Sequence, residues 1–143
     1  MKVKQISVFL ENKSGRLGDV TRTLSDSGLN IRALSIADTA DYGLLRLIVD
    51  DPDRATRILT DQGFTVAATE VLAIEVPDRP GGLAGIIDIL SARGLNIDYM
   101  YAFVGTSGEN AIVIFRTEPV DKAIEALKEG GARILTGDEL HAL

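Results

Sequence analysis

The stretch SDSGLNI at residues 25–31 returns as SARGLNI at residues 91–97, 66 positions later. The same offset relates two strand-to-helix junctions, NKSGRL at residues 12–17 and DRPGGL at residues 78–83. Seven positions within these stretches are identical at this one offset, as are Leu24 and Leu90 just before them, which chance does not produce over so short a window. The chain is therefore predicted to contain two copies of one unit of about 70 residues.

The hydrophobic periodicity of each copy alternates between strand and helix patterns. In the first copy it predicts strands and helices in the order strand 6–10, helix 17–24, strands 29–37 and 44–49, helix 54–62 and strand 64–68. The second copy repeats the order as strand 71–76, helix 83–90, strands 95–104 and 111–116, helix 119–128 and strand 133–135. The expected fold is α+β, with two ferredoxin-like βαββαβ modules at residues 1–68 and 69–143. Each module is expected to have an antiparallel sheet with both helices on one face.

The composition excludes several classes of protein. The chain has 143 residues, 45% of them hydrophobic, with a net charge of −6 and no cysteine. Its lysines and arginines are scattered among more numerous acids, so no nucleic acid is expected as a partner. The lack of cysteine removes disulfides, thiolate metal sites and a cysteine nucleophile. No apolar stretch approaches the roughly 20 residues that a membrane helix needs, so we expect a cytoplasmic protein without a membrane partner.

The sequence contains none of the common catalytic motifs. A nucleophile elbow, the lysine of a P-loop and a histidine paired with a nucleophile are all missing. The acids Asp50, Asp51 and Asp53 precede a predicted helix, where the helix dipole favours carboxylates. We therefore expect neither an enzyme, nor a metal site, nor a cofactor.

The two repeated turns are the candidate binding sites. Each leads from a strand into a helix whose first backbone N–H groups have no partner within the helix, which suits a small anion such as a carboxylate. Gly15 and Gly81 permit close approach of a ligand. The side-chain oxygens of Asn12 and Asp78 can accept hydrogen bonds from an ammonium group. An amino acid fits this description, and the alternative is that these polar residues only form the turn and cap the helix.

Each copy resembles an ACT domain, a small-ligand regulatory module of amino-acid metabolism. The resemblance rests on NKSGRL…GLNI and DRPGGL…GLNI, and it covers nearly the whole chain as two tandem copies. ACT modules typically bind an amino acid where two modules meet, between the first strand–helix turn of one and the start of the second strand of its neighbour. The resemblance implies ligand-binding roles for Asn12, Ser14, Gly15, Arg16, Leu17, Asn30 and Ile31, and for Asp78, Pro80, Gly81, Gly82, Leu83, Asn96 and Ile97.

The two copies differ within the turn. Arg16 stands where the second copy has Gly82, and it either holds a ligand carboxylate or fills the pocket. Asp78 carries a charge that suits an ammonium better than its amide counterpart does. Some serine-binding members of the family have a histidine where this chain has Leu10 and Val76. This difference favours apolar or aromatic ligands, and the two sites are expected to differ in affinity.

The hydrophobic pattern also predicts an assembly. The strands expected at residues 44–49 and 111–115 are apolar on both faces, whereas a sheet with helices on one side should have a polar face. We therefore expect a second layer and at least a homodimer. Only residues 67–70 join the two copies, which favours either a nearly continuous strand or a strand exchanged between units.

The expected function is that of a non-catalytic regulatory protein, which binds an amino acid at the module interfaces and passes the signal on by changed packing. Two alternatives remain. ISVFLENKSGRLGDV resembles the start of the acetohydroxyacid synthase regulatory subunit, so the first is a regulatory small subunit of a biosynthetic enzyme. The second is a protein-interaction adaptor that binds no small ligand.

Overall fold

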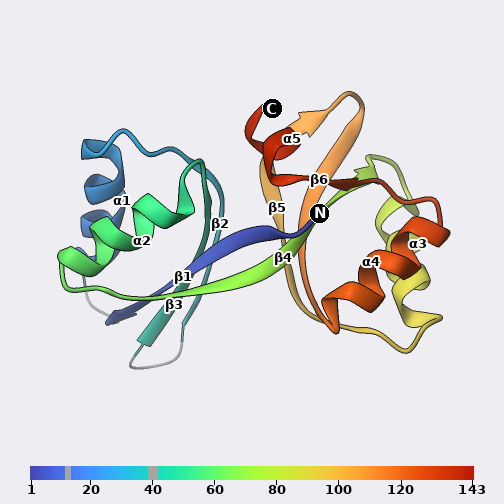
Figure 1. Cartoon of the computed structure of the whole chain (residues 1–143), viewed down its shortest axis with the longest axis horizontal. Coiled ribbons are helices and arrows are strands. Elements are labelled where there is room, and N and C mark those ends of the chain that lie inside the picture. The colour runs from blue at the N-terminus through green and yellow to red at the C-terminus, as the bar shows by residue number, and fades with distance from the viewer. Residues whose placement is uncertain (12–13, 39–41) are drawn as a thin grey trace. The chain divides into compact units, whose positions relative to one another are not determined.

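The computed structural model describes residues 1–11, 14–38 and 42–143. The described chain forms two compact units, one of residues 4–69 and one of residues 1–3 together with residues 70–143. Each unit has helices packed on an antiparallel sheet, as Figure 1 shows, so the predicted α+β class with antiparallel sheets is confirmed.

The described residues form six elements up to residue 77, and the last of them, β4, continues from the first unit into the second. In chain order they are β1 (Val3–Glu11), α1 (Arg16–Asp26), β2 (Ile31–Asp38), β3 (Tyr42–Val49), α2 (Pro52–Asp61) and β4 (Thr65–Pro77). β1 pairs antiparallel with β3, and β3 pairs antiparallel with β2. β1 also pairs with β4. Both helices lie on the same face of this sheet.

Alternating side chains of β1 form one wall of the first core. Ile6, Val8 and Leu10 are buried against the helices, while Phe9 between them is half exposed. The core is completed by Val20 and Leu24 of α1, Leu45, Leu47 and Val49 of β3, Ala55 and Leu59 of α2, and by Leu29 and Phe64. The apolar side chains on one face of the strand therefore pack against the apolar face of each helix and form a single core.

The second unit follows β4 along the chain. Its further elements are α3 (Gly82–Ser91), β5 (Asn96–Ser107), β6 (Asn110–Glu118), α4 (Val120–Glu129), β7 (Ile134–Leu135) and α5 (Gly137–His141). β6 pairs antiparallel with both β5 and β4, and β4 pairs antiparallel with β7. The core lies between the sheet and α3 and α4, and it includes Leu72, Ile74, Val76, Ile86, Leu90, Phe115, Ala123 and Leu127.

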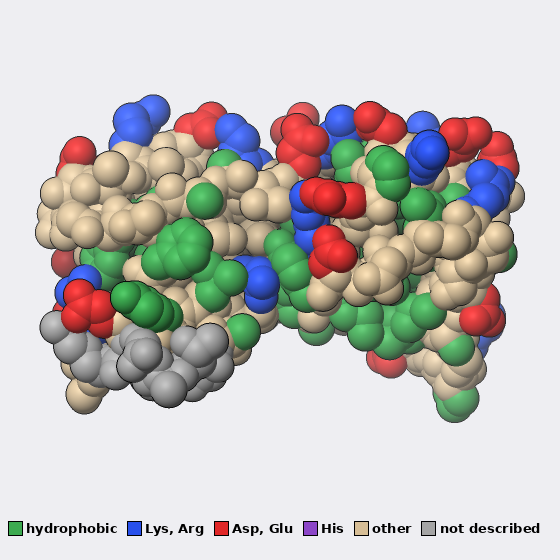
Figure 2. All heavy atoms as spheres, turned by 90° about the horizontal axis from the view of Figure 1, so that it is seen from below, with side chains coloured by type: hydrophobic (Ala, Val, Ile, Leu, Met, Phe, Trp, Pro, Cys, Tyr) green, Lys and Arg blue, Asp and Glu red, His purple; other side chains and the backbone are tan. Residues whose placement is uncertain are grey.

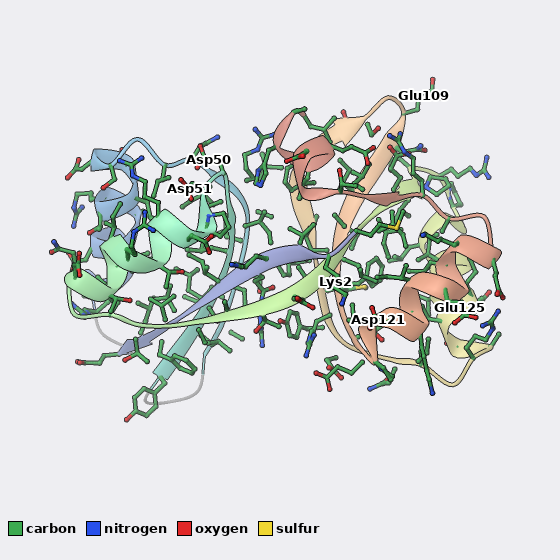
Figure 3. All side chains as sticks on the ribbon, viewed as in Figure 1. Lys2, Asp50, Asp51, Glu109, Asp121 and Glu125 are labelled. Carbon is green, nitrogen blue, oxygen red and sulfur yellow. The ribbon has the colours of Figure 1, made fainter. Side chains whose placement is uncertain are left out.

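The N-terminal residues belong to this second unit. The Lys2 ammonium lies 3.1 Å from a carboxylate oxygen of Asp121 and 3.6 Å from one of Glu70, and Figure 3 shows the first of these pairs. The hydrogen bond from Lys2 to Asp121, with the negative charges of both acids, raises the pKa of the lysine. All three side chains are exposed to solvent, so these ion pairs add little to the stability of the protein. Their main effect is to hold Lys2 beside the two acids.

β4 is a single strand where the sequence predicts two, at residues 64–68 and 71–76. β4 runs without interruption over thirteen residues, through the expected end of the first copy and the expected start of the second. The sequence AATE at residues 67–70 has neither glycine nor proline to break a strand, which explains the continuity. Of the two predicted ways of joining the copies, the structure has the nearly continuous strand.

The repeated GLNI sequence ends α1 and α3 in the same way. Leu29 N–H donates to the Leu24 carbonyl at 2.9 Å, and Leu95 N–H donates to the Leu90 carbonyl at 3.0 Å. The chain reverses at Gly28 and Gly94, whose φ values of 72° and 67° lie in the left-handed region that glycine adopts freely. The motif is therefore a helix-ending signal, used once in each unit.

The short helix α5 is not predicted by the sequence pattern. It is held by a capping box in which the Thr136 hydroxyl accepts from Glu139 N–H at 3.1 Å and the Glu139 carboxylate accepts from Thr136 N–H at 3.2 Å. Leu140 is fully buried, while the only histidine, His141, is partly buried. Five residues are too few to show a helical period, and the spacing of Thr136 and Glu139 is the one local sign of this helix in the sequence. Over the described residues, no helix is long and apolar enough to cross a membrane.

The capping box generates a prediction about acid stability. The pKa of Glu139 lies below its ordinary value of 4.5 because the Thr136 N–H donates to its carboxylate, and the Arg133 guanidinium adds a second favourable contact. The folded state therefore binds this proton less readily than the unfolded chain does. The contribution of Glu139 to stability is present above the unfolded-state pKa and is lost as pH falls through the folded-state pKa.

We expect Glu139→Gln to lower the free energy of unfolding at about pH 7 and to lower it progressively less toward about pH 3. Urea unfolding at several pH values measures this difference between variant and wild type. Glu125→Gln, an exposed position on α4, is the control. A difference between Glu139→Gln and wild type that stays constant over this range would contradict the assignment.

Candidate ligand-binding site

The turn between β4 and α3 brings charged side chains to the start of a helix. β4 ends at Pro77 and α3 begins at Gly82, with Gly81 at the N-cap in the left-handed conformation, φ 85°. Glycine has no side chain with which to cap the helix, whereas at α2 the Asp51 carboxylate accepts from Arg54 N–H at 3.1 Å. Gly82 N–H donates to the Arg79 carbonyl at 3.0 Å, and the rest of the first turn of α3, with its partial positive charge, has no side-chain cap.

A cavity of about 440 Å³ lies beside this turn. Its charged wall carries Asp78 and Arg79, and the remainder is formed by Val76, Pro77, Pro80, Leu83, Ala111 and Val113. A carboxylate and a guanidinium thus line one cavity that is otherwise mostly apolar. This combination offers an acceptor for an ammonium group, a donor for a carboxylate and an apolar surface for a side chain.

Arg79 is a cavity residue that the sequence analysis missed. It lies between two predicted site residues, Asp78 and Pro80, and the first copy has another cation, Lys13, at the equivalent position. That shared charge was a usable signal.

Gly82 makes the turn tight. A Cβ atom at this position would lie 1.9 Å from the Pro77 carbonyl oxygen, far inside van der Waals contact. The first residue of α3 therefore packs directly on the last residue of β4, and only glycine allows this approach. The equivalent first residue of α1 is Arg16, so the two turns cannot be built identically.

In the first unit, the side chain of Arg16 turns onto the core. Its guanidinium carbon lies 4.7 Å from the centre of the Phe64 ring, and Nη1 lies 3.5 Å from the Asp19 carboxylate. The stacking is a cation–π contact. Of the two sequence-based interpretations of Arg16, this position is nearer to space-filling than to ligand contact. A cavity of about 320 Å³ opens on its outer side, between α1 and Gln62.

The other predicted residues of the first turn that the structure describes are exposed. Gly15 has φ 92° and so matches Gly81, and Ser14 and Leu17 lie at the surface. Asn12, predicted to accept from an ammonium group, lies outside the described residues. The described part of the turn thus has the same glycine-led entry into the helix as the second unit.

The predicted strand residues lie apart from the turn cavities. Ile31 and Ile97 pack against the cores of their own units. Asn30 N–H donates to the Asp50 carboxylate at 3.1 Å, and the Asn96 carbonyl accepts from the Thr117 hydroxyl at 2.7 Å. In the second unit, the turn residues Asp78, Pro80 and Leu83 share one cavity that Asn96 and Ile97 do not line.

The acids near α2 have structural partners, as the sequence predicts. Figure 3 shows Asp50 and Asp51 at the start of α2, where Asp51 caps the helix. Asp53 receives a 2.6 Å hydrogen bond from Lys4, which lowers the pKa of the carboxyl group below its ordinary value. Among the residues that the structure describes, no group of three or more metal-ligating side chains is placed to hold an ion.

The close approach at Gly82 predicts opposite effects for two alanine substitutions in one helix. We expect Gly82→Ala to destabilise the protein by about 1–3 kcal/mol or more, because backbone must move to admit the methyl group. Gly85→Ala, one turn later, meets nothing within 4 Å and should stabilise by about 0.5–1 kcal/mol. Urea unfolding of both variants measures the contrast, and equal effects would show that the turn is looser than described.

Comparison with known proteins places this geometry in a family. A family profile described as an ACT domain pair matches residues 1–143. Among solved structures, protein BT0572 from Bacteroides thetaiotaomicron is 45% identical, and the alignment covers 100% of this chain and 98% of that chain with a TM-score of 0.93. A search of curated proteins finds no match.

More distant structures share the fold. The ligand-free regulatory subunit of aspartate kinase from Thermus thermophilus is 17% identical, with 89% of this chain and 91% of that chain covered and a TM-score of 0.62. Aspartate kinase from Clostridium acetobutylicum is 16% identical, with 91% of this chain and 33% of that chain covered and a TM-score of 0.55. The full-length profile match and the 45% identical structure show that this chain belongs to the ACT domain pair family.

Proposed function

We propose that this chain is a non-catalytic, cytoplasmic regulatory protein that binds a free amino acid at the turn between β4 and α3. The main support is the cavity that Asp78 and Arg79 line together with apolar side chains, at the start of a helix whose N-cap is a glycine. Membership of the ACT domain pair family supports a regulatory role. As in other sensors, the signal passes on when the ligand favours one packing arrangement over another.

The cavity chemistry orients the ligand. The ligand carboxylate lies toward the first turn of α3 and the Arg79 guanidinium, and the ligand ammonium lies toward Asp78. Its side chain then faces Val76, Ala111 and Val113, which line the same cavity. Three aliphatic neighbours favour an apolar side chain over a polar one, in agreement with the sequence-based expectation.

The first turn is the weaker of the two sites. Its Arg16 guanidinium stacks on Phe64, where the second turn has a glycine. Ligand binding through Arg16 would require that the stack be broken, at a cost of about 0.5–1 kcal/mol or more. The proposal therefore assigns the higher affinity to the second turn.

We expect one or two of the twenty L-amino acids to raise the thermal unfolding midpoint at millimolar concentration. A ligand at about 100 times its Kd adds about 2.7 kcal/mol to stability, which corresponds to a shift of several degrees. Differential scanning calorimetry at fixed protein concentration measures it. The chain has no tryptophan, so intrinsic fluorescence is a poor alternative.

The variant Asp78→Asn should remove most of that shift, because it deletes the charge that faces the ligand ammonium. Asp88→Asn, an exposed acid later in α3, is the matched control and should keep the shift. If no amino acid stabilises the wild type, the turns act only as helix starts, and the adaptor alternative is favoured.

We further propose a homodimer, because apolar side chains remain uncovered in the first unit. Phe9 is 49% exposed on the face of the sheet opposite to α1 and α2, and its register partner Leu44 lies on that face too. Figure 2 shows hydrophobic side chains reaching one surface of the molecule between acidic and basic ones. A second copy of the chain can cover such a face and complete the ligand site with a neighbouring module.

Sedimentation velocity at micromolar concentration should give about twice the monomer mass of 15.3 kDa. Phe9→Glu should shift the population toward monomer, because it buries a charge in the interface. Thr60→Glu, on the exposed side of α2, should leave the mass unchanged. If the wild-type protein sediments as a monomer, the dimer proposal is wrong, and the calorimetric test of ligand binding is unaffected.

The regulated enzyme is proposed to be a separate chain. The fold is shared with a regulatory subunit of aspartate kinase over most of both chains, and such a subunit acts on a partner. The alternative function, a small subunit like that of acetohydroxyacid synthase, would also require a separate enzyme chain as partner. Co-purification from the native cell, with and without the amino acid identified by calorimetry, tests for that partner.

A further inference from the structure

A buried carboxylate in β4 has no counterpart in the first unit. Glu75 is only 9% exposed and stands in VLAIEV at residues 71–76, where every other side chain is apolar and buried. The equivalent residue of the first copy, 66 positions earlier, is Phe9. Burying an ionised carboxylate costs free energy unless the group is well partnered, so its presence in one copy alone points to a use for the charge.

The Glu75 carboxylate is held by two side chains that are distant in sequence. Arg133 Nη1 donates to Oε1 at 2.8 Å, and Asn110 Nδ2 donates to Oε2 at 3.2 Å. The other arm of the Arg133 guanidinium donates to Glu139 Oε2 at 2.7 Å. Each Glu75 oxygen therefore accepts one of these bonds and has a further lone pair for a ligand.

These polar groups line a cavity of about 310 Å³ in the second unit. Glu75, Asn110 and Arg133 form its polar wall, and Pro77, Ile86 and Ile89 supply apolar surface. A concave space in which apolar side chains face a few convergent polar groups is a form that small-molecule sites take. This cavity shares only Pro77 with the turn cavity, so the two are separate.

The charges around the cavity select a cation. Of the residues that line the cavity, Glu75 is negative and Arg133 is positive. Arg133 is also paired with Glu139, which lies outside the lining and brings the charge of this group of three to −1. The neighbouring backbone donors are already used: Gly131 N–H bonds the Lys128 carbonyl at 3.1 Å and Ala132 N–H bonds the Leu127 carbonyl at 2.9 Å. A ligand carboxylate would have to compete with two glutamates for one guanidinium.

We propose that this cavity binds a small organic cation, a primary amine with a short aliphatic body. The ammonium group donates to the Glu75 carboxylate beside Asn110, and the aliphatic body lies on Ile86 and Ile89. The volume is near the lower end of the roughly 300–1,000 Å³ found for ligand sites, which limits the body to a few carbons. The inference does not depend on amino-acid binding at the β4–α3 turn.

Two-dimensional NMR of the ¹⁵N-labelled full chain tests the proposal. n-Butylammonium chloride is titrated at about pH 7 and constant ionic strength, with sodium butyrate as the probe of equal length and opposite charge. We expect butylammonium to give saturable shifts of the Asn110 side-chain amide and of the backbone amides of residues 130–132. Butyrate should leave these signals in place.

Two variants locate the interaction. Glu75→Gln keeps the shape of the side chain and removes its charge, and should weaken butylammonium binding at least about tenfold. Glu125→Gln, on the exposed side of α4 in Figure 3, removes one acid from the same unit and should bind as the wild type does. The dispersion of each spectrum shows whether the variant is folded.

Three results would overturn the site. They are equal shifts with butyrate, shifts confined to the amides of Asp78, Gly81 and Gly82, and unchanged binding by a folded Glu75→Gln. If that variant does not fold, the wild-type comparison of the two probes decides alone. Because the turn amides and the residue 130–132 amides report separately, failure of either site is distinguishable from failure of the other.

Discussion

The approach of the α3 backbone to the Pro77 carbonyl is the constraint on which the candidate site depends. With 1.9 Å between that oxygen and the place of a Cβ atom, the first residue of the helix must be glycine. This contact directs the start of α3 at the end of β4 and sets Asp78 and Arg79 on the wall of one cavity. The backbone contact therefore fixes where Asp78 and Arg79 leave the turn, while both side chains are exposed to solvent.

The two copies share the path of the backbone around their first helices but differ in the side chains there. Both copies enter their first helix through a left-handed glycine and leave it through a second one, because these positions decide the path of the chain. Between these fixed points the side chains have diverged. Arg16 stacks on Phe64 in one unit, and Gly82 packs against the Pro77 carbonyl in the other, so the two units have different cavities beside their first helices.

The second unit also carries a buried carboxylate whose partners come from distant segments of the chain. Glu75, Asn110 and Arg133 come from β4, from the start of β6 and from the segment before β7, and Arg133 is also linked to the capping box of α5. A ligand that alters the Glu75–Arg133 contact therefore acts on an element attached to the capped terminal helix.

The sequence by itself determined the duplication, the antiparallel α+β class, the glycine turns and the helix ends, because these depend on local periodicity and on residues close together in the chain. Asp78, Pro80 and Leu83 were predictable for the same reason. The tertiary structure alone decided that β4 is one strand, that Arg16 lies on Phe64, that Arg79 lines the turn cavity and that Arg133 meets Glu75 across 58 residues. These contacts depend on how distant segments pack, and no spacing along the chain encodes the direction in which a long side chain turns.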